Sequence, residues 1–170
     1  MSKFRFFVVF SLLFLSACGQ GEIHAQQREE RDLMIEKQAF LSFSWIEQGF
    51  YGIFEPLKLK IGTTSNELIK QFGDPENVDV YEGGIAWIYD DSTFLINSET
   101  KKVVASALNI KKKQLTTDHL KKALGTPDLT ELDEMDGYLI YYYYLDDYEL
   151  SFETDEESGS LIYAWFKQRE

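Results

Sequence analysis

The sequence predicts an α+β protein in which an N-terminal helix precedes two tandem repeats, each made of one short helix and three strands. Three observations support this fold class: a duplicated segment, a Gly-x-Pro stop after each repeat helix, and alternating apolar residues in the strands that follow. The strands are expected to form antiparallel sheet with the helices on one side. The predicted divisions of the chain are 1–17, 18–27, 28–54, 55–110 and 111–170.

Residues 1–17 have the pattern of a bacterial signal peptide. Lys3 and Arg5 form a small basic region, and the apolar run Phe6–Leu15 that follows contains one polar residue. A membrane-spanning helix needs about 20 apolar residues, so this run is too short to serve as one. We therefore expect residues 1–17 to be removed from the mature protein.

The segment Leu15-Ser16-Ala17-Cys18 resembles the lipobox of bacterial lipoproteins, in which the precursor is cut before the cysteine. The resemblance implies that Cys18 carries a thioether-linked diacylglycerol, with or without an amide-linked acyl chain. Two or more acyl chains, at roughly 0.8 kcal/mol per buried methylene, anchor a protein stably. We expect a protein anchored by lipid to the extracytoplasmic face of the cell membrane. Ordinary secretion after Ala17, with a free thiol on Cys18, is the alternative.

The mature chain is strongly acidic. The full sequence has 17 Lys and Arg against 29 Asp and Glu, and loss of Lys3 and Arg5 leaves 15 against 29, a charge of −14. This charge argues against nucleic acid as a partner and against direct adhesion to anionic lipid head groups. Residues 18–27 form a polar tether from Cys18, and its nine residues after the cysteine reach about 30 Å at most. Cys18 is the only cysteine, so the chain has no internal disulfide.

Residues 28–54 are expected to form the N-terminal helix and a connector. Apolar residues recur on one helical stripe from Arg28 onward, and Gly49 and Gly52 end the helix in a turn. A mostly apolar connector then leads to Pro56. The stripe residues are Ile35, Ala39, Phe43 and Ile46.

The two repeat helices are predicted by the match between residues 64–75 and 116–127, at an offset of 52. Each copy begins with residues that cap helices and runs for about two turns before Gly73-Asp74-Pro75 or Gly125-Thr126-Pro127. The glycine can adopt the backbone conformation that ends a helix, and the proline cannot continue it.

The strands follow each helix. Ile85–Asp91 matches Tyr141–Asp147 at an offset of 56, and the four added residues are placed in the acidic loop Glu131–Asp136, where insertions cost little. Each Asp-Asp pair predicts a hairpin turn into a second strand. The predicted second strands are Thr93–Ile96 and Tyr148–Phe152, and the third strands are Val103–Ile110 and Leu161–Phe166.

One string of residues carries a family resemblance: Ile61-Gly62-Thr63-Thr64, then Leu68, Phe72-Gly73-Asp74-Pro75 and Trp87-Ile88-Tyr89. It resembles the repeat of the secreted β-lactamase inhibitory protein and is similar to the SmpA/OmlA-type outer-membrane lipoproteins. It most resembles a family of unknown function among Gram-positive secreted proteins and lipoproteins, with an N-terminal helix before two repeats. The resemblance covers residues 30–168 and implies a tandem α+β fold. In the β-lactamase inhibitor, the sheet face binds the partner enzyme.

Alternation in the first strand of each repeat predicts two faces. Ala86 and Ile88, with Tyr142 and Tyr144, are expected to face away from the helices and to form a candidate protein-binding face. Tyrosines offer a rigid aromatic body with a polar tip, which suits protein contact. The alternative is that these tyrosines only cover the sheet. The residues expected to face the helices are Ile85, Trp87, Tyr89, Tyr141, Tyr143 and Leu145, with Phe94, Ile96, Leu150 and Phe152 in the same layer.

The sequence predicts no metal site, no cofactor and no catalytic constellation. The acidic clusters lack the glycine-punctuated spacing of a calcium loop and are expected to be solvated turns. His24 lies in the tether, and His119, which aligns with Glu67, is expected to be an exposed helix residue. These two histidines cannot pair locally in a zinc site. The clusters lie at Glu131, Asp133, Glu134 and Asp136, at Asp146 and Asp147, and at Asp155, Glu156 and Glu157.

The anchor, the duplication and the lack of a catalytic pattern together favour a non-catalytic module of the cell envelope. Such a module would bind an envelope or secreted protein or serve a structural role. One alternative is an inhibitor of a secreted hydrolase, such as a β-lactamase or a protease. The other is a hydrolase that uses carboxylates such as Asp146 or Glu149.

Overall fold

The computed structural model describes residues 28, 31, 40–81 and 84–169 of the chain. The chain divides into two compact units, Met1–Glu36 and Lys37–Glu170. Within the first unit, Arg28 and Arg31 are described, and both are helical and exposed. The predicted signal peptide, Cys18, the tether and His24 lie outside the described residues. Among the residues that are described, no helix has the length and apolar character that a membrane span requires.

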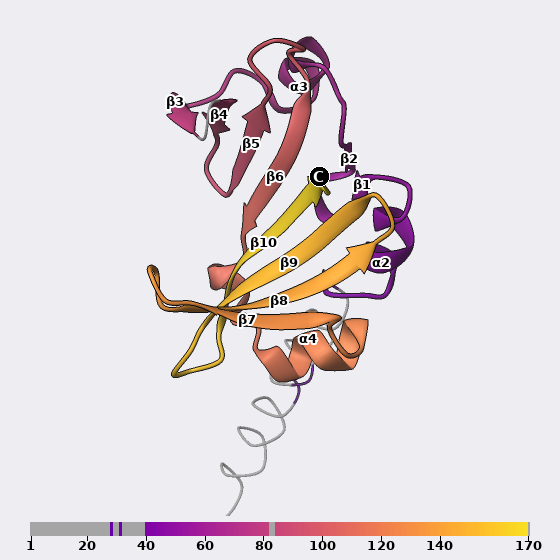
Figure 1. The fold of residues 1–170 in the computed structure, drawn as a ribbon, viewed down its shortest axis with the longest axis vertical. Helices are drawn as coiled ribbons and strands as arrows, with labels where there is room; N and C mark the ends of the chain where they lie inside the picture. The colour runs from indigo at the N-terminus through magenta and orange to yellow at the C-terminus, as the bar shows by residue number, and fades with distance from the viewer. Residues whose placement is uncertain (1–27, 29–30, 32–39, 82–83, 170) are drawn as a thin grey trace, which may run out of the picture. The chain divides into compact units, whose positions relative to one another are not determined.

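The second unit contains short helices and one large antiparallel sheet (Figure 1). The α-helices are α2 (Ser44–Gly49), α3 (Ser65–Phe72) and α4 (Thr117–Leu124). The 3-10 helices are η1 (Glu55–Leu57) and η2 (Lys111–Lys113), and β1 (Ile53–Phe54) pairs with β2 (Leu59–Lys60). The strands of the large sheet are β3 (Asn77–Tyr81), β4 (Gly84–Ile88), β5 (Ser92–Ile96), β6 (Val103–Asn109), β7 (Leu129–Asp133), β8 (Tyr138–Leu145), β9 (Tyr148–Asp155) and β10 (Leu161–Gln168).

The large sheet has the strand order β3-β4-β5-β6-β10-β9-β8-β7. Two meanders of four strands, one after α3 and one after α4, meet where their last strands pair. In this central pairing of β6 with β10, Ala105 lies opposite Lys167, and Ala107 lies opposite Trp165. The eight strands therefore form one continuous antiparallel sheet, as the sequence predicted in outline.

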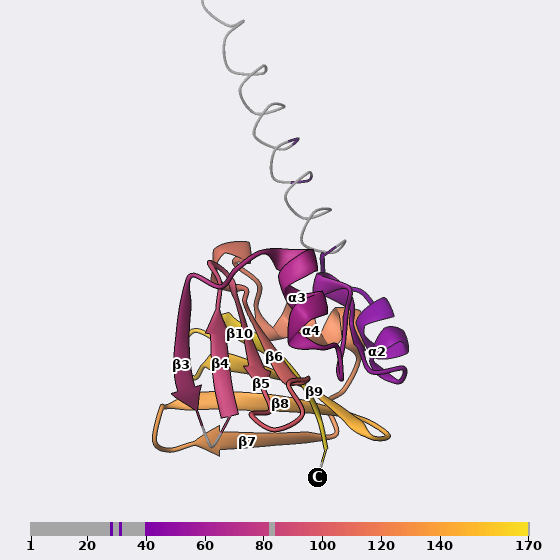
Figure 2. The same ribbon diagram turned by 90° about the horizontal axis from the view of Figure 1, so that it is seen from above.

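The helices α2, α3 and α4 pack on the same side of this sheet, and Figure 2 shows them gathered there. Leu68 of α3 and Leu120 of α4 are fully buried among the sheet residues of the core. Burying a side chain of this size contributes about 1.5–3 kcal/mol. Every residue expected to face the helices belongs to the core or packs against it, so the predicted alternation is confirmed.

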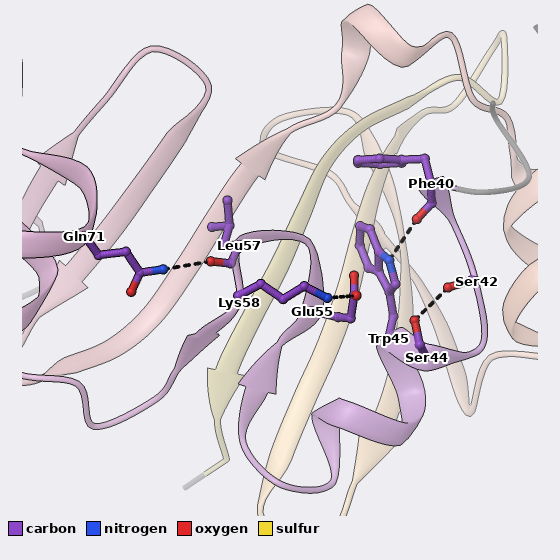
Figure 3. Close-up of polar contacts among 8 residues, drawn as sticks. All are labelled: Phe40, Ser42, Ser44, Trp45, Glu55, Leu57, Lys58 and Gln71. Atoms are coloured by element: carbon purple, nitrogen blue, oxygen red, sulfur yellow. Dashed lines mark hydrogen bonds and ion pairs between the residues drawn. The ribbon is translucent and has the colours of Figure 1, made fainter.

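The predicted N-terminal helix is interrupted before α2. Leu41 and Ser42 are not helical, and the prediction of one continuous helix to Gly49 is wrong at this point. The indole Nε1 of Trp45 donates to the backbone oxygen of Phe40 at 2.9 Å, which is the oxygen that a continuous helix would pair with the amide of Ser44 (Figure 3). The hydroxyls of Ser42 and Ser44 lie 2.7 Å apart and bridge the break.

The break lets the N-terminal segment insert two large side chains into the core. Leu41 and Trp45 are both almost completely buried. The Trp45 ring stacks on Phe152 of β9 with centroids 5.7 Å apart, and its edge meets Phe54 at 5.6 Å. Phe54 in turn stacks on Phe166 of β10. These aromatic contacts cover the second meander, which is why the segment before the first repeat helix is part of the fold.

The predicted strands are confirmed, but two strands were missed. The sequence predicted three strands after each helix, and the structure has four. The additional ones are β3 and β7, which form the two edges of the sheet. Every residue of β3 is exposed, and Glu131–Asp133, predicted as loop, belong to β7. β3 does alternate polar and apolar residues through Val78 and Val80, but the run is short and these side chains stay exposed. The Asn and Asp residues of these strands disfavour strand structure and weaken the signal further.

The strand pairings also correct the predicted alignment of the two halves. Trp87 pairs with Phe94, and Tyr141 pairs with Phe152. The residue of the second half that corresponds to Trp87 is therefore Tyr141, which gives an offset of 54 rather than 56. The hydroxyl of Tyr89 donates to the backbone oxygen of Gly73, and that of Tyr143 donates to Gly125, at the same offset of 54. The added residues therefore lie in the β7–β8 turn and in a longer β8–β9 hairpin, and not all in the acidic loop.

The two repeat helices begin and end as the sequence predicts. At the start of α3, Thr64 and Glu67 form a reciprocal capping box, with the Thr64 hydroxyl donating to Glu67 Oε2 at 2.7 Å. This hydrogen bond is the main reason that the pKa of Glu67 lies below its usual value. At the ends of α3 and α4, Gly73 and Gly125 have φ angles of 82° and 88°, which residues with a Cβ rarely adopt.

His119 is the capping residue of α4 and not simply an exposed helix residue. Its Nδ1 lies 2.8 Å from the hydroxyl of Thr116 and accepts from the Thr116 amide at 3.2 Å. The side chain is half-buried. It occupies the position that Glu67 has in α3, so an imidazole replaces a carboxylate in the same capping box.

We predict that His119→Ala lowers the free energy of unfolding by about 0.5–2 kcal/mol, because the first turn of α4 loses its cap. His119→Glu should keep most of that stability, since glutamate makes the same contacts in α3. Thermal and denaturant unfolding of both variants measures the difference, with Lys122→Ala on the exposed face of α4 as the control. Equal stability of His119→Ala and the parent chain would contradict the capping role.

Candidate binding face

The side of the sheet opposite the core is here called the open face, and two rows of side chains cross it. Both rows run perpendicular to the strands, from β4 to β8. At about 4.8 Å between neighbouring strands, the five steps span about 24 Å. The first row is Ile88, Thr93, Ala107, Trp165, Ser151 and Tyr142. The second row is Ala86, Leu95, Ala105, Lys167, Glu149 and Tyr144.

The four residues of the predicted binding face all lie on the open face, but they do not form one patch. Ile88 and Ala86 lie at one end of the rows, and Tyr142 and Tyr144 lie at the other. The two tyrosine rings stack with centroids 6.3 Å apart, and both are half-buried. Ala86 is only 6% exposed, because its short side chain lies between larger neighbours. Ala86 therefore offers no surface to a partner, and the tyrosine end is the better candidate.

The last strand supplies residues that the sequence analysis missed. Trp165 and Lys167 of β10 lie on the open face between the two predicted pairs. Arg169 follows β10, and its guanidinium carbon lies 4.3 Å from the centroid of the Tyr144 ring. Alternation counted from the buried Leu161 would have placed Trp165, four positions on, toward the core. The register of β10 shifts between Leu161 and Tyr163, and this irregularity turns Trp165 to the open face.

Glu149 is a buried acid on the open face. The residue is 9% exposed, and Lys167 Nζ lies 3.3 Å from its Oε1. Within the described part of the chain, no donor meets Oε1 with hydrogen-bond geometry, so the contact is an ion pair only. Asp146, the other acid suggested for catalysis, lies in the β8–β9 turn with a φ of 56°. Its backbone oxygen accepts from Arg169 Nη1 at 3.3 Å.

A groove of about 710 Å³ hollows the open face beside these charges. Leu95, Val104 and Ala105 contribute its apolar lining. Glu149, Lys167 and Arg169 contribute charged groups. The volume falls within the range of about 300–1,000 Å³ that is usual for ligand sites. The short side chain of Ala105 on the central strand β6 lies in the lining of the groove, between Leu95 and Lys167.

Burial shifts the pKa of several groups around the tyrosines. The pKa of Tyr142 is raised, first by burial and then by the negative charge of Glu131. Burial also raises the pKa of Tyr143, whose hydroxyl is bonded to Gly125. The pKa of Glu153 is raised mainly by burial, and the neighbouring indole of Trp165 offsets part of the rise. The Trp165 Nε1 is itself buried without a hydrogen bond to any described residue.

The acidic clusters act within their own turns. Asp133 Oδ1 accepts from the amide of Met135 at 2.9 Å, and Asp155 Oδ1 accepts from Ser158 at 2.7 Å. The hydrogen bonds from Ser158 hold the pKa of Asp155 below its usual value. Within the described ranges, no three His, Cys, Asp or Glu side chains are grouped so as to hold a metal ion.

These features define an α+β protein with one antiparallel sheet that is covered by helices on one face and open on the other. A family model described as "Domain of unknown function (DUF4309)" matches residues 49–166. The chain belongs to this family. The expected membership of a family of unknown function is therefore confirmed, while the likeness to β-lactamase inhibitory protein and to SmpA/OmlA-type lipoproteins is not confirmed.

Two solved structures are similar to the chain. The crystal structure of a DUF4309 family protein (YjgB) from Bacillus subtilis matches with a TM-score of 0.62 and 17% identity, over 79% of this chain and 97% of that one. That likeness shows the fold alone. A cysteine-rich secretory protein (SAV1118) from Staphylococcus aureus matches with a TM-score of 0.41 and 13% identity, over 64% of this chain and 43% of that one. A search of curated proteins found no match.

We predict that Glu153→Gln stabilises the protein at pH 7. The Glu153 carboxyl has a raised pKa in the folded state, so the folded state binds this proton more tightly than the unfolded chain does. The carboxyl therefore destabilises the folded state once the pH rises above the pKa that it has in the unfolded chain. Glutamine removes that cost. Because Glu153 is partly exposed, the rise in Tm should be small, about 1 °C.

The gain from Glu153→Gln should disappear below pH 4, where glutamate is protonated in both states. Thermal unfolding between pH 3.5 and pH 7.5 measures it. Glu157→Gln, an exposed change in the turn after β9, is the matched control. A gain that persists at pH 3.5 would show that charge is not its cause.

Proposed function

We propose that this protein is a lipid-anchored module on the extracytoplasmic face of the cell membrane that binds another envelope or secreted protein without catalysis. The lipobox resemblance at Leu15–Cys18 supports the anchor, and the acidic composition supports a protein partner over nucleic acid. The family match is to a domain of unknown function and leaves the activity open.

The observation that carries this proposal is the aromatic surface at one end of the open face. Tyr144 lies there beside Arg169, with Tyr142 stacked on it and Trp165 further along the same row as Tyr142. Tyrosine, tryptophan and arginine are the residue types that dominate binding energy at protein interfaces. The surface is presented by paired strands rather than by loops, so its side chains are held in place before a partner arrives. Such preorganisation reduces the entropy cost of binding.

We also propose that the binding face arose within a duplicated unit of one helix and four strands. The recurring Tyr-to-Gly hydrogen bonds and the matching bridges Thr64–Lys102 and Thr116–Ser160 support a shared plan. In this proposal the two halves are joined by their last strands. Only the second half has tyrosines on the open face of its second strand. The first half has Ile88 where the second has Tyr142.

We predict that replacing both Tyr142 and Tyr144 by alanine abolishes capture of the partner. Hot-spot aromatic residues contribute about 2 kcal/mol or more each, so loss of the pair should weaken binding by several hundredfold, at about 1.4 kcal/mol per factor of ten. Cross-linking in intact cells, followed by identification of the adduct and a binding assay with purified partner, measures the loss. Loss of activity of a captured secreted hydrolase in that assay would specify the role as inhibition.

The matched control for the tyrosine pair is Tyr51→Ala, which removes a tyrosine that is 70% exposed and lies outside the large sheet. Circular dichroism and the Tm establish that each variant is folded. A folded Tyr142→Ala/Tyr144→Ala variant that still captures the same partner with unchanged affinity would refute the proposed face.

We predict that Cys18→Ser moves the protein from the membrane fraction to the soluble or secreted fraction. Without the thiol no diacylglycerol can be attached, and the remaining protein–membrane contact is opposed by its negative charge. Fractionation and metabolic labelling with palmitate measure the change, with Ser16→Ala as a control that keeps the cysteine. Palmitate incorporation into the Cys18→Ser chain would contradict lipidation at this residue.

A further inference from the structure

The groove on the open face has a charge balance opposite to that of the chain. The sequence holds 29 acidic against 17 basic residues, whereas two cations and one carboxylate line the groove. The carboxylate of Glu149 is buried and already paired with Lys167 at 3.3 Å. Among the residues that line the groove, the charge left to attract a ligand is therefore the positive charge of Arg169.

Arg169 is fixed in position before any ligand arrives. Its backbone amide donates to the oxygen of Asp147 at 2.9 Å, and its Nη1 donates to the oxygen of Asp146 at 3.3 Å. The guanidinium stacks on the Tyr144 ring at 4.3 Å. A guanidinium carries five N–H donors in a planar fork that matches a carboxylate, and stacking on a ring leaves the edges of that fork accessible.

On the side of β5 and β6 the groove has an apolar portion, with the polar Asn97 next to it. Leu95 and Ala105 lie on the open face, and Val104 occupies the irregular step where the pairing of β5 with β6 shifts its register. A segment that fits this groove would place an anionic side chain at Arg169 and an apolar side chain against Leu95 and Val104. The groove is open on one side, which suits a protruding protein segment more than an enclosed small molecule.

We propose that the groove receives a protein segment in which a glutamate or aspartate is flanked by apolar residues, with the carboxylate paired to Arg169. This inference rests on the proposed protein-binding function and names the chemistry of the partner. It also extends the binding surface from Tyr144 toward β5. Lys167 neutralises Glu149, so the buried carboxylate repels an anion at Arg169 less than an unpaired carboxylate would.

The test uses three peptides that differ at one position: N-acetyl-Leu-Glu-Leu-amide and its analogues with glutamine or lysine in the centre. Each is titrated into the full chain in zwitterionic detergent, and amide chemical shifts give the affinity and the location. The glutamate peptide should bind at least about fivefold more tightly than the glutamine peptide and should shift the resonances of Leu95, Val104 and Arg169. The lysine peptide should bind most weakly.

Arg169→Gln should remove the preference for glutamate, and Lys122→Glu, a change of charge on α4, should leave it intact. Equal binding of the three peptides, or shifts that fall outside the groove, would overturn the inference. A response in the groove to phosphatidylglycerol vesicles but not to the peptides would overturn it in favour of a lipid head group. Another outcome is that the peptides fail to bind in the groove while partner capture still depends on Tyr142 and Tyr144. That outcome would overturn the acidic-segment inference and leave the proposed function intact.

Discussion

The pairing of β6 with β10 is the interaction on which the rest of the structure depends. Each four-strand meander ends in one of these strands, and five residue pairs, from Lys167–Ala105 to Tyr163–Asn109, join the two into one sheet. On the core side, Ser106 lies between Phe94 and Phe166, so a small residue admits two large rings. Its hydroxyl is buried without a partner among the described residues, a cost that close packing must offset.

The same pairing shapes the open face. Ala105 and Ala107 lie there opposite Lys167 and Trp165, so each pair combines one short and one long side chain. Ala105 and Lys167 both line the groove, the short side chain on the side of the first meander and the long one on the side of the second. One end of the open face has short apolar side chains, and the other end has aromatic and charged ones. This asymmetry follows from the residues that β6 and β10 place opposite each other. Neither meander alone has this surface.

The sequence predicted those features that leave a local signal. Helix stops at Gly73 and Gly125, the inward alternation around Phe94 and Phe152, and the Asp-Asp turns all depend on neighbours in the chain. The edge strands β3 and β7 were missed because their apolar residues, such as Val78, Val80 and Leu132, are few and lie among polar residues. Arg169, Glu149 and Lys167 come together through strand pairing across 20 positions of sequence, and no spacing rule reports that contact.

Several acidic residues of the described part of the chain make structural contacts within the fold. Asp133 and Asp155 accept backbone hydrogen bonds in their own turns, Glu67 caps α3, and Glu149 is neutralised by Lys167. A glycosidase needs two carboxylates facing one substrate, one of them free to carry a proton at neutral pH. Glu153 has a raised pKa, but burial is the main cause, and its neighbours on the open face are aromatic rings that suit contact rather than proton transfer. Among the described residues of this part of the open face, the groups exposed to solvent are therefore mainly aromatic side chains and the guanidinium of Arg169.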